Sequence, residues 1–218
     1  MSYRMMAVLV IPTVNMKEGR FADTWALLNT LPRTKMTKLS VVDREAPISN
    51  SLHSYAYYID GIPDVLFSKG YGEEEPLPSM PEGYTCLTIS VPESGIVGLH
   101  GHHDRFLGML GVFFSGMGAL YGVTLHELDL SVETMNWSEF CMLLGGVHLF
   151  SSRLVKIIGQ EKLVASAPMH GKLDDGGVWQ RFSDDYFFGM PNEHAPAMRA
   201  LLAEMWSKAD LESLTRQG

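Results

Sequence analysis

The amino-acid sequence predicts an α+β fold, in which a mixed or antiparallel sheet is packed by helices around a central glycine-rich helix. Strand-like apolar runs interleave irregularly with helical patterns along the chain, whereas a doubly wound parallel sheet requires regular alternation of the two. Leu163–Met169 and Val178–Ser183 also flank the turn-forming sequence 172–177, which is typical of a hairpin between antiparallel neighbours.

The strands predicted in the first half follow from apolar runs and alternation. Met5–Ile11 is continuously apolar and ends at Pro12, which is the pattern of a buried strand. In the predicted strand Tyr84–Val91, threonine and serine alternate with aliphatic residues, so we expect one side of this strand to face solvent. The other predicted strands of this half are Lys38–Asp43, Leu52–Asp60 and Tyr84–Val91.

Phe21–Leu31 carries apolar residues at helical spacing and is followed by Pro32, so it predicts a helix. Between 61 and 83 the chain contains four prolines and four glycines, which predicts a long loop. With 218 residues, of which 46% are hydrophobic, the chain is compatible with a single domain over 1–218. The alternative is a two-half layout whose boundary lies near 61–83.

The segment Arg105–Tyr121 is almost entirely apolar or small, and it predicts a buried central helix. Its small residues recur at spacings of three and four, which would leave one face without side-chain bulk and permit close backbone approach. The residues of this predicted face are Gly108, Gly111, Ser115, Gly118 and Gly122.

The second half adds a strand over Val123–Val132 and two helices. Asn136 with Glu139 three residues later forms a capping-box pattern, which predicts a helix over Trp137–Ile158 that Gly159 ends. His148 lies beside the apolar stripe of this helix and is interpreted as a core or boundary histidine. Ala195–Leu214 predicts the final helix; its inward-facing residues are Met198, Leu201, Leu202 and Met205.

The charge balance bears on the class of partner. The formal net charge is −8, which disfavours binding to nucleic acid or to anionic membranes and favours basic partners. No run approaches the ~20 apolar residues of a spanning helix. The apolar start of the chain reads as a first strand rather than a signal peptide. Cys86 and Cys141 lie in apolar segments, as expected for buried thiols of a reduced compartment. We therefore expect a cytoplasmic protein.

The main candidate for enzyme chemistry is the sequence 100–105, in which His100, His102 and Asp104 follow the pattern H-x-H-x-D. This pattern resembles the start of the metallo-β-lactamase hydrolase motif, which implies metal-dependent hydrolysis through an activated water. Arg105 stands where that family has another histidine, and arginine cannot ligate a cation. Further ligands would have to come from His148 and His170.

A turn before a helix is the competing interpretation of the same cluster. Asp104 would then serve as the N-cap of the following helix, and the histidines would be available for contact with a partner. The sequence has no G-x-S-x-G elbow, P-loop or dinucleotide fingerprint. Glu127 and Asp129 share one face of a predicted strand, which is typical of a solvated surface. The sequence indicates no cofactor and no oligomeric state.

Two acidic neighbourhoods are candidate contact surfaces. The first contains Glu73, Glu74 and Glu75. The second mixes carboxylates with aromatic residues, which combines electrostatic steering with anchors for contact. Its residues are Asp184, Asp185, Tyr186, Phe187 and Phe188.

The acidic α+β chain, its Gly-Gly hairpin, this acidic-aromatic loop, Pro191–His194 and the terminal helix together resemble bacterial immunity proteins of type VI and polymorphic-toxin systems. The resemblance covers about the last 45 residues and implies binding to a cognate toxin, often a basic nuclease. Our first hypothesis is therefore a non-enzymatic, toxin-neutralising protein. The alternatives are the metal-dependent hydrolase and an assembly protein that packs through the glycine-rich helix.

Overall fold

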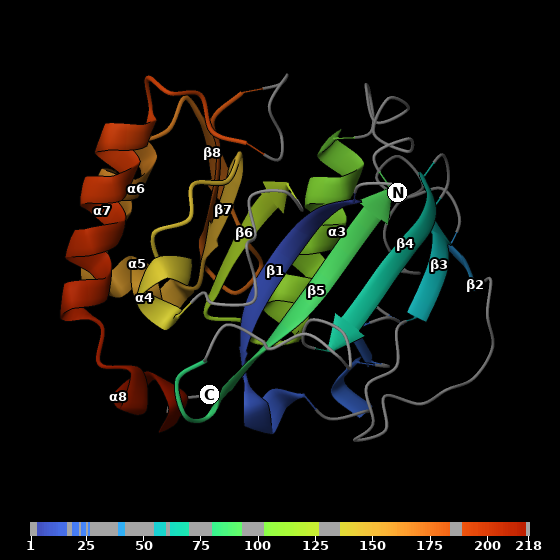
Figure 1. Ribbon diagram of the computed structural model, residues 1–218. Coiled ribbons are helices and arrows are strands. Elements are labelled where there is room, and N and C mark those ends of the chain that lie inside the picture. Colours follow the sequence, from blue (N-terminus) through green and yellow to red (C-terminus); the bar gives the residue numbers. More distant parts are fainter. Residues whose placement is uncertain are drawn as a thin grey trace.

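The fold is α+β, with one nine-stranded sheet flanked by helices in the computed structural model (Figure 1). The structure describes residues 4–16, 19–21, 23–24, 26, 39–41, 55–59, 62–69, 80–92, 103–126, 136–183 and 189–216. All strand pairs within these residues are antiparallel, and the sheet order is β2-β3-β4-β5-β1-β6-β7-β9-β8.

The strands are short to medium in length and β1 lies at the centre of the sheet. Their bounds are β1 Arg4–Pro12, β2 Leu39–Val41, β3 Tyr55–Ile59, β4 Ile62–Lys69, β5 Tyr84–Pro92, β6 Tyr121–His126, β7 Val147–Phe150, β8 Met169–Lys172 and β9 Val178–Arg181.

The helices form two groups. The bounds of the described helices are η1 Thr13–Asn15, α3 His103–Gly116, α4 Trp137–Phe140, α5 Ser152–Ile158, α6 Gln160–Ala165, α7 Ala195–Lys208 and α8 Leu211–Arg216. In Figure 1, α3 crosses behind β1 and β5, whereas α4 to α7 lie together at the left. Within the described residues, no helix is long and apolar enough to span a membrane.

Both faces of the central sheet are buried, which explains the continuous apolar run of β1. Leu9 belongs to the core cluster formed with α3, and its neighbour Val8 belongs to the cluster formed with the other helices. Two apolar cores therefore share one strand, because successive residues of a strand point to opposite faces. The solvent-facing side predicted for Tyr84–Val91 is wrong for this reason: Thr88 and Ser90 are only 5% and 7% exposed.

The predicted loop at 61–83 contains a strand. Ile62–Lys69 forms β4, which pairs with β3 and β5 inside the sheet. Its isoleucine, valine, leucine and phenylalanine suit a strand, and the surrounding prolines and glycines concealed that pattern. Pro63 is the second residue of the strand.

The predicted helix Trp137–Ile158 is wrong as a single element. The capping box is present, since the Asn136 side chain accepts from the Glu139 backbone N–H and the Glu139 side chain accepts from that of Asn136. The helix nevertheless ends at Phe140, and Val147–Phe150 forms β7. At Gly145 a Cβ would lie 1.9 Å from the Thr124 carbonyl oxygen, so the chain passes β6 at a distance that only glycine permits.

The buried glycine-rich helix is confirmed as α3, although its predicted smooth face is wrong. Gly118 follows the helix with φ +59°, and Gly122 lies in β6 against Leu9 and Leu149. A Cβ at Gly108 would meet no atom within 4 Å, and one at Gly111 would meet Leu173 at 3.3 Å. The glycines therefore serve a helix cap and strand packing rather than one helix–helix contact.

The remaining C-terminal elements have the predicted type of secondary structure but different bounds. The hairpin consists of β8 and β9, with residues 163–165 forming the end of α6 instead of the start of the strand. Gly159 ends α5 with φ 90°. The last predicted helix divides into α7 and α8, and its four predicted inward residues are buried. Cys86 and Cys141 are buried free thiols.

Candidate partner-binding site

Several segments that carry candidate residues are attached at one end of the sheet, which we call the α3 end. There β1 begins, and the register pairs Arg4 with Pro92 at the end of β5 and Met5 with His126 at the end of β6. β9 also ends there, with Arg181 opposite the first residue of β7. In the upper part of Figure 1, the arrowheads of β5 and β6 and the first turn of α3 lie at this end.

The chain leaves the α3 end into three segments that lie outside the described residues. The segment 93–102 contains His100 and His102, the segment 127–135 contains Glu127 and Asp129, and 184–188 is the acidic-aromatic sequence. The described strands thus attach at one end three candidate groups that are far apart in sequence. These attachment points share one end because of the strand order and register, which the sequence patterns did not predict.

An ion pair joins two of these attachment points. Arg181 Nη1, at the end of β9, donates to Asp104 Oδ1 in the first turn of α3 at 3.2 Å. The Arg181 side chain is 8% exposed, whereas that of Asp104 is 93% exposed. Arg181 Nε also donates to the Ser183 carbonyl oxygen at 3.2 Å. Arg181 thus contacts both the Ser183 backbone and the first turn of α3.

Asp104 is not the N-cap that the sequence predicted. The helix already begins at His103, which places Asp104 inside the first turn. A carboxylate there still complements the helix dipole, and its outward position allows it to pair with Arg181. Arg181 is the functional candidate that sequence reasoning missed; its signal was a single charged residue in the predicted strand Val178–Ser183.

Glu73, Glu74 and Glu75 lie outside the described residues, and the strand that precedes them ends away from the α3 end. β4 terminates at Lys69, which pairs with Leu87, whereas its earlier residue Leu66 pairs with Ser90. Figure 1 shows the arrowhead of β4 pointing opposite to that of β5. The two acidic neighbourhoods are therefore attached at opposite ends of the sheet.

The described residues provide no metal centre: among them, no three histidine, cysteine or acidic side chains are grouped as ligands. His148 and His170 both face Gln180 in the register, from strands on either side of β9. His148 is fully buried while His170 is exposed, and Asp104 already contacts a guanidinium. His100 and His102 lie outside the described residues.

Two titratable side chains of the core, His148 and Cys141, are buried and held in their neutral forms. Burial lowers the pKa of His148 to about 3, although a backbone hydrogen bond with Gly145 partly offsets this shift. Burial also raises the pKa of the Cys141 thiol. Both side chains lie in the core, as the sequence predicted, and burial favours the uncharged imidazole and the protonated thiol.

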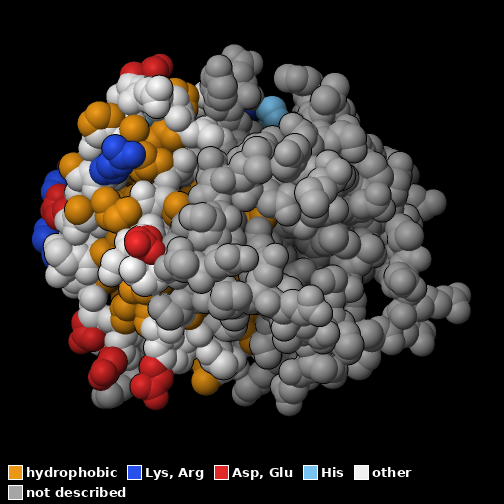
Figure 2. Space-filling view, in the orientation of Figure 1, with side chains coloured by type: hydrophobic (Ala, Val, Ile, Leu, Met, Phe, Trp, Pro, Cys, Tyr) orange, Lys and Arg blue, Asp and Glu red, His pale blue; other side chains and the backbone are white. Residues whose placement is uncertain are grey.

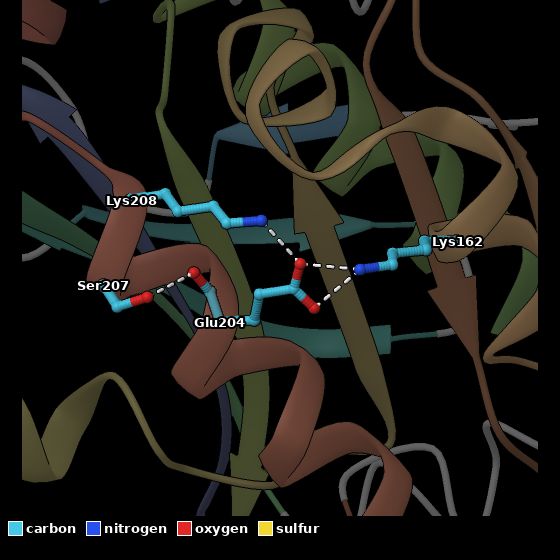
Figure 3. Close-up of polar contacts among 4 residues, drawn as sticks. All are labelled: Lys162, Glu204, Ser207 and Lys208. Atoms are coloured by element: carbon cyan, nitrogen blue, oxygen red, sulfur yellow. Dashed lines mark hydrogen bonds and ion pairs between the residues drawn. The ribbon is translucent and has the colours of Figure 1, made fainter.

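The described surface of the helical layer carries mixed side chains. In Figure 2, apolar, acidic and basic side chains are interspersed on the left, with acidic groups near the lower edge. Figure 3 shows one cluster there, in which Lys162 of α6 and Lys208 of α7 each lie 2.6 Å from Glu204. Hydrogen bonds from Lys162 and Lys208 lower the pKa of Glu204 to about 2. This cluster ties α6 to α7.

Comparison with known proteins identifies a similar fold. No family model matches the sequence, and no curated protein sequence matches it. Among solved structures, the chain is similar to the Pseudomonas aeruginosa T6SS protein PA0821, with a TM-score of 0.51 and 12% sequence identity. The similarity covers 93% of this chain and 73% of that one.

Proposed function

We propose that this chain is a non-enzymatic binding protein of a type VI secretion system (T6SS), specifically a cytoplasmic immunity protein that binds and blocks a cognate toxin. The observation that carries the proposal is the similarity of nearly the whole chain to a T6SS protein. The sequence resemblance to immunity proteins supports the same assignment from a separate direction.

The chemistry of the described residues supports a binding role over catalysis. His148 and Cys141 are core residues, and Asp104 is engaged with Arg181. A net charge of −8 would attract a basic toxin, and charge complementarity mainly accelerates association and selects the partner.

In this proposal the 184–188 segment is the principal contact, since its attachment at Ser183 is held against α3 through Arg181. Its carboxylates would steer the toxin and its aromatic residues would anchor it. Glu73–Glu75 would form a second contact region, attached at the opposite end of the sheet.

Competition between cells tests the proposal. In the native host, a strain that lacks this gene should be killed by parental cells that fire their T6SS, and spared by parental cells whose secretion is inactivated. Restoring the gene should restore survival. A deletion strain that competes normally against secreting parental cells would overturn the immunity assignment.

Two matched variants locate the contact. The double variant Asp184→Asn with Asp185→Asn should lose protection. A control that removes the same charge from exposed positions elsewhere, Glu161→Gln with Asp174→Asn, should retain it. Equal protection by both variants would reject the 184–188 segment as the contact.

Metal analysis of the purified protein tests the non-enzymatic part of the proposal. We expect no stoichiometric zinc, manganese or iron. A bound metal that is lost in His102→Ala would instead support the hydrolase hypothesis.

A further inference from the structure

Two arginine side chains, of Arg20 and of Arg153 in α5, donate to backbone carbonyls at the C-terminal end of α3, at the end of the sheet opposite to the α3 end. Arg20 Nε donates to the Gly116 carbonyl oxygen at 2.8 Å. Arg153 Nη2 donates to the Gly118 carbonyl oxygen at 3.1 Å, and its Nη1 donates to that of Leu214 at 2.6 Å. Positive charge here complements the helix dipole.

Neither guanidinium has a carboxylate partner among the described residues. Helix capping uses only part of their donor capacity, because each guanidinium carries five N–H groups. Arg20 makes a second hydrogen bond to the 3-10 turn that follows β1, where its Nη1 donates to Asn15 Oδ1 at 2.6 Å.

Two donors are left over at this point. Asn15 is 5% exposed, and its Nδ2 has no hydrogen-bond partner within the part of the chain that the structure describes. Arg20 Nη2 makes no hydrogen bond to a described residue either. These two nitrogens lie 2.9 Å and 2.7 Å from the position that a Cβ at Gly118 would occupy. An amide donor and a cationic donor therefore converge beside a residue that has no side chain.

A buried donor without an acceptor is destabilising, so this arrangement suits an acceptor that binds from outside the chain. The acceptor must carry negative charge to suit two guanidiniums, and at least two oxygens to serve both free donors. The site is near the surface, since Arg20 and Gly118 are only half-buried and Val14 of the adjoining turn is 56% exposed.

We propose that Asn15, Arg20 and Arg153 form a binding site for one oxyanion group, a carboxylate or a phosphate, at the C-terminal end of α3. Asn15 Nδ2 and Arg20 Nη2 bind its oxygens directly, and Arg153 contributes positive potential while it holds the Gly118 carbonyl. The proposal does not rest on the assignment of a toxin as the partner.

Calorimetric titration of the full chain with inorganic phosphate, and separately with acetate, tests the proposal against sodium chloride of equal ionic strength. Saturable binding of phosphate or acetate is expected, and the tighter of the two identifies the oxyanion class. Heats no larger than those of chloride for both ions would overturn the site.

Asn15→Asp is the decisive variant, because it retains the oxygen that accepts from Arg20 Nη1 and replaces the free donor with a second oxygen. Its carboxylate would occupy the site internally, so anion affinity should fall at least tenfold while the protein stays folded. The control Lys156→Gln removes one exposed charge from α5 and should bind like the wild type. Undiminished binding by Asn15→Asp would mean that the ion binds elsewhere, and the proposal would be wrong.

Discussion

The hydroxyl of Tyr121 lies 2.7 Å from Nδ1 of His148, and both side chains are fully buried. Burial raises the pKa of Tyr121 well above its ordinary value, so the hydroxyl stays protonated and can donate a hydrogen bond to Nδ1 in the tautomer whose proton is on Nε2. The pair is enclosed by aromatic rings, with Phe150 stacked on His148 and Trp206 edge-on to Tyr121. A polar contact thus joins β6 to β7 inside the core.

This pair predicts a loss of stability in acid. Since the pKa of His148 is about 3 in the folded state against an ordinary value of 6.5, the unfolded chain binds the extra proton between these values. The contribution of the buried, neutral His148 to the free energy of unfolding is therefore complete above pH 6.5 and is lost as the pH falls towards 3. At pH 5 the free energy of unfolding should be about 2 kcal/mol lower than at pH 7 from this residue.

Urea denaturation of wild type and His148→Gln at several pH values isolates this effect, because glutamine does not titrate and can still bond Tyr121. The free energy of unfolding of the wild type should fall more steeply in acid than that of the variant, so any advantage of the wild type should narrow or reverse as the pH falls. Parallel pH profiles would show that His148 is not the responsible group.

Two chemically identical substitutions should change stability in opposite directions. Gly145→Ala would place a Cβ 1.9 Å from the Thr124 carbonyl oxygen, and the backbone of β6 cannot yield without losing pairing. We expect a loss of at least about 3 kcal/mol. Gly108→Ala meets no atom within 4 Å in the middle of a helix, and should gain roughly 0.5–1 kcal/mol. Thermal unfolding of both variants measures this difference, and a tolerated Gly145→Ala would contradict the close approach.

The ion pair between Asp104 and Arg181 should couple α3 to β9 weakly. Asp104→Ala should destabilise the fold by roughly 1 kcal/mol, because the pair is charge-assisted but exposed on the aspartate side. In an Arg181→Met background the same change should have almost no effect. A double-mutant cycle measured by urea denaturation gives the coupling. Asp174→Ala, an exposed turn variant, serves as the neutral control, and a zero coupling would remove this link from the proposed site.

The Glu204 cluster should contribute stability that depends on salt and on acid. The pKa of Glu204 is about 2 in the folded protein, below its ordinary value of 4.5. The stability that the ionised Glu204 contributes is therefore complete above pH 4.5 and is lost as the pH falls towards 2. Glu204→Gln should lower the melting temperature slightly at low ionic strength, and the difference from wild type should vanish in 1 M salt, where screening is strong. A salt-independent difference would point to lost packing instead.

Local sequence patterns were sufficient to predict those elements whose buried and exposed positions follow from their own side-chain periodicity. The continuous run of β1, the turn of the β8–β9 hairpin and the inward stripe of α7 each follow from side-chain periodicity, and all three are present. The same periodicity misassigned Val147–Phe150, because an apolar run of four residues is equally compatible with a buried strand and a helix turn.

The sequence alone therefore predicted the α+β class, the buried helix α3 and a core or boundary position for His148, since apolar periodicity can be recognised along a single segment of the chain. Only the tertiary structure decided which distant residues meet. Arg181 contacts Asp104 across 77 positions, and Arg20 reaches Gly116 across 96. These contacts depend on strand order and register, which arise from the packing of the whole sheet against its two helical layers rather than from any single segment.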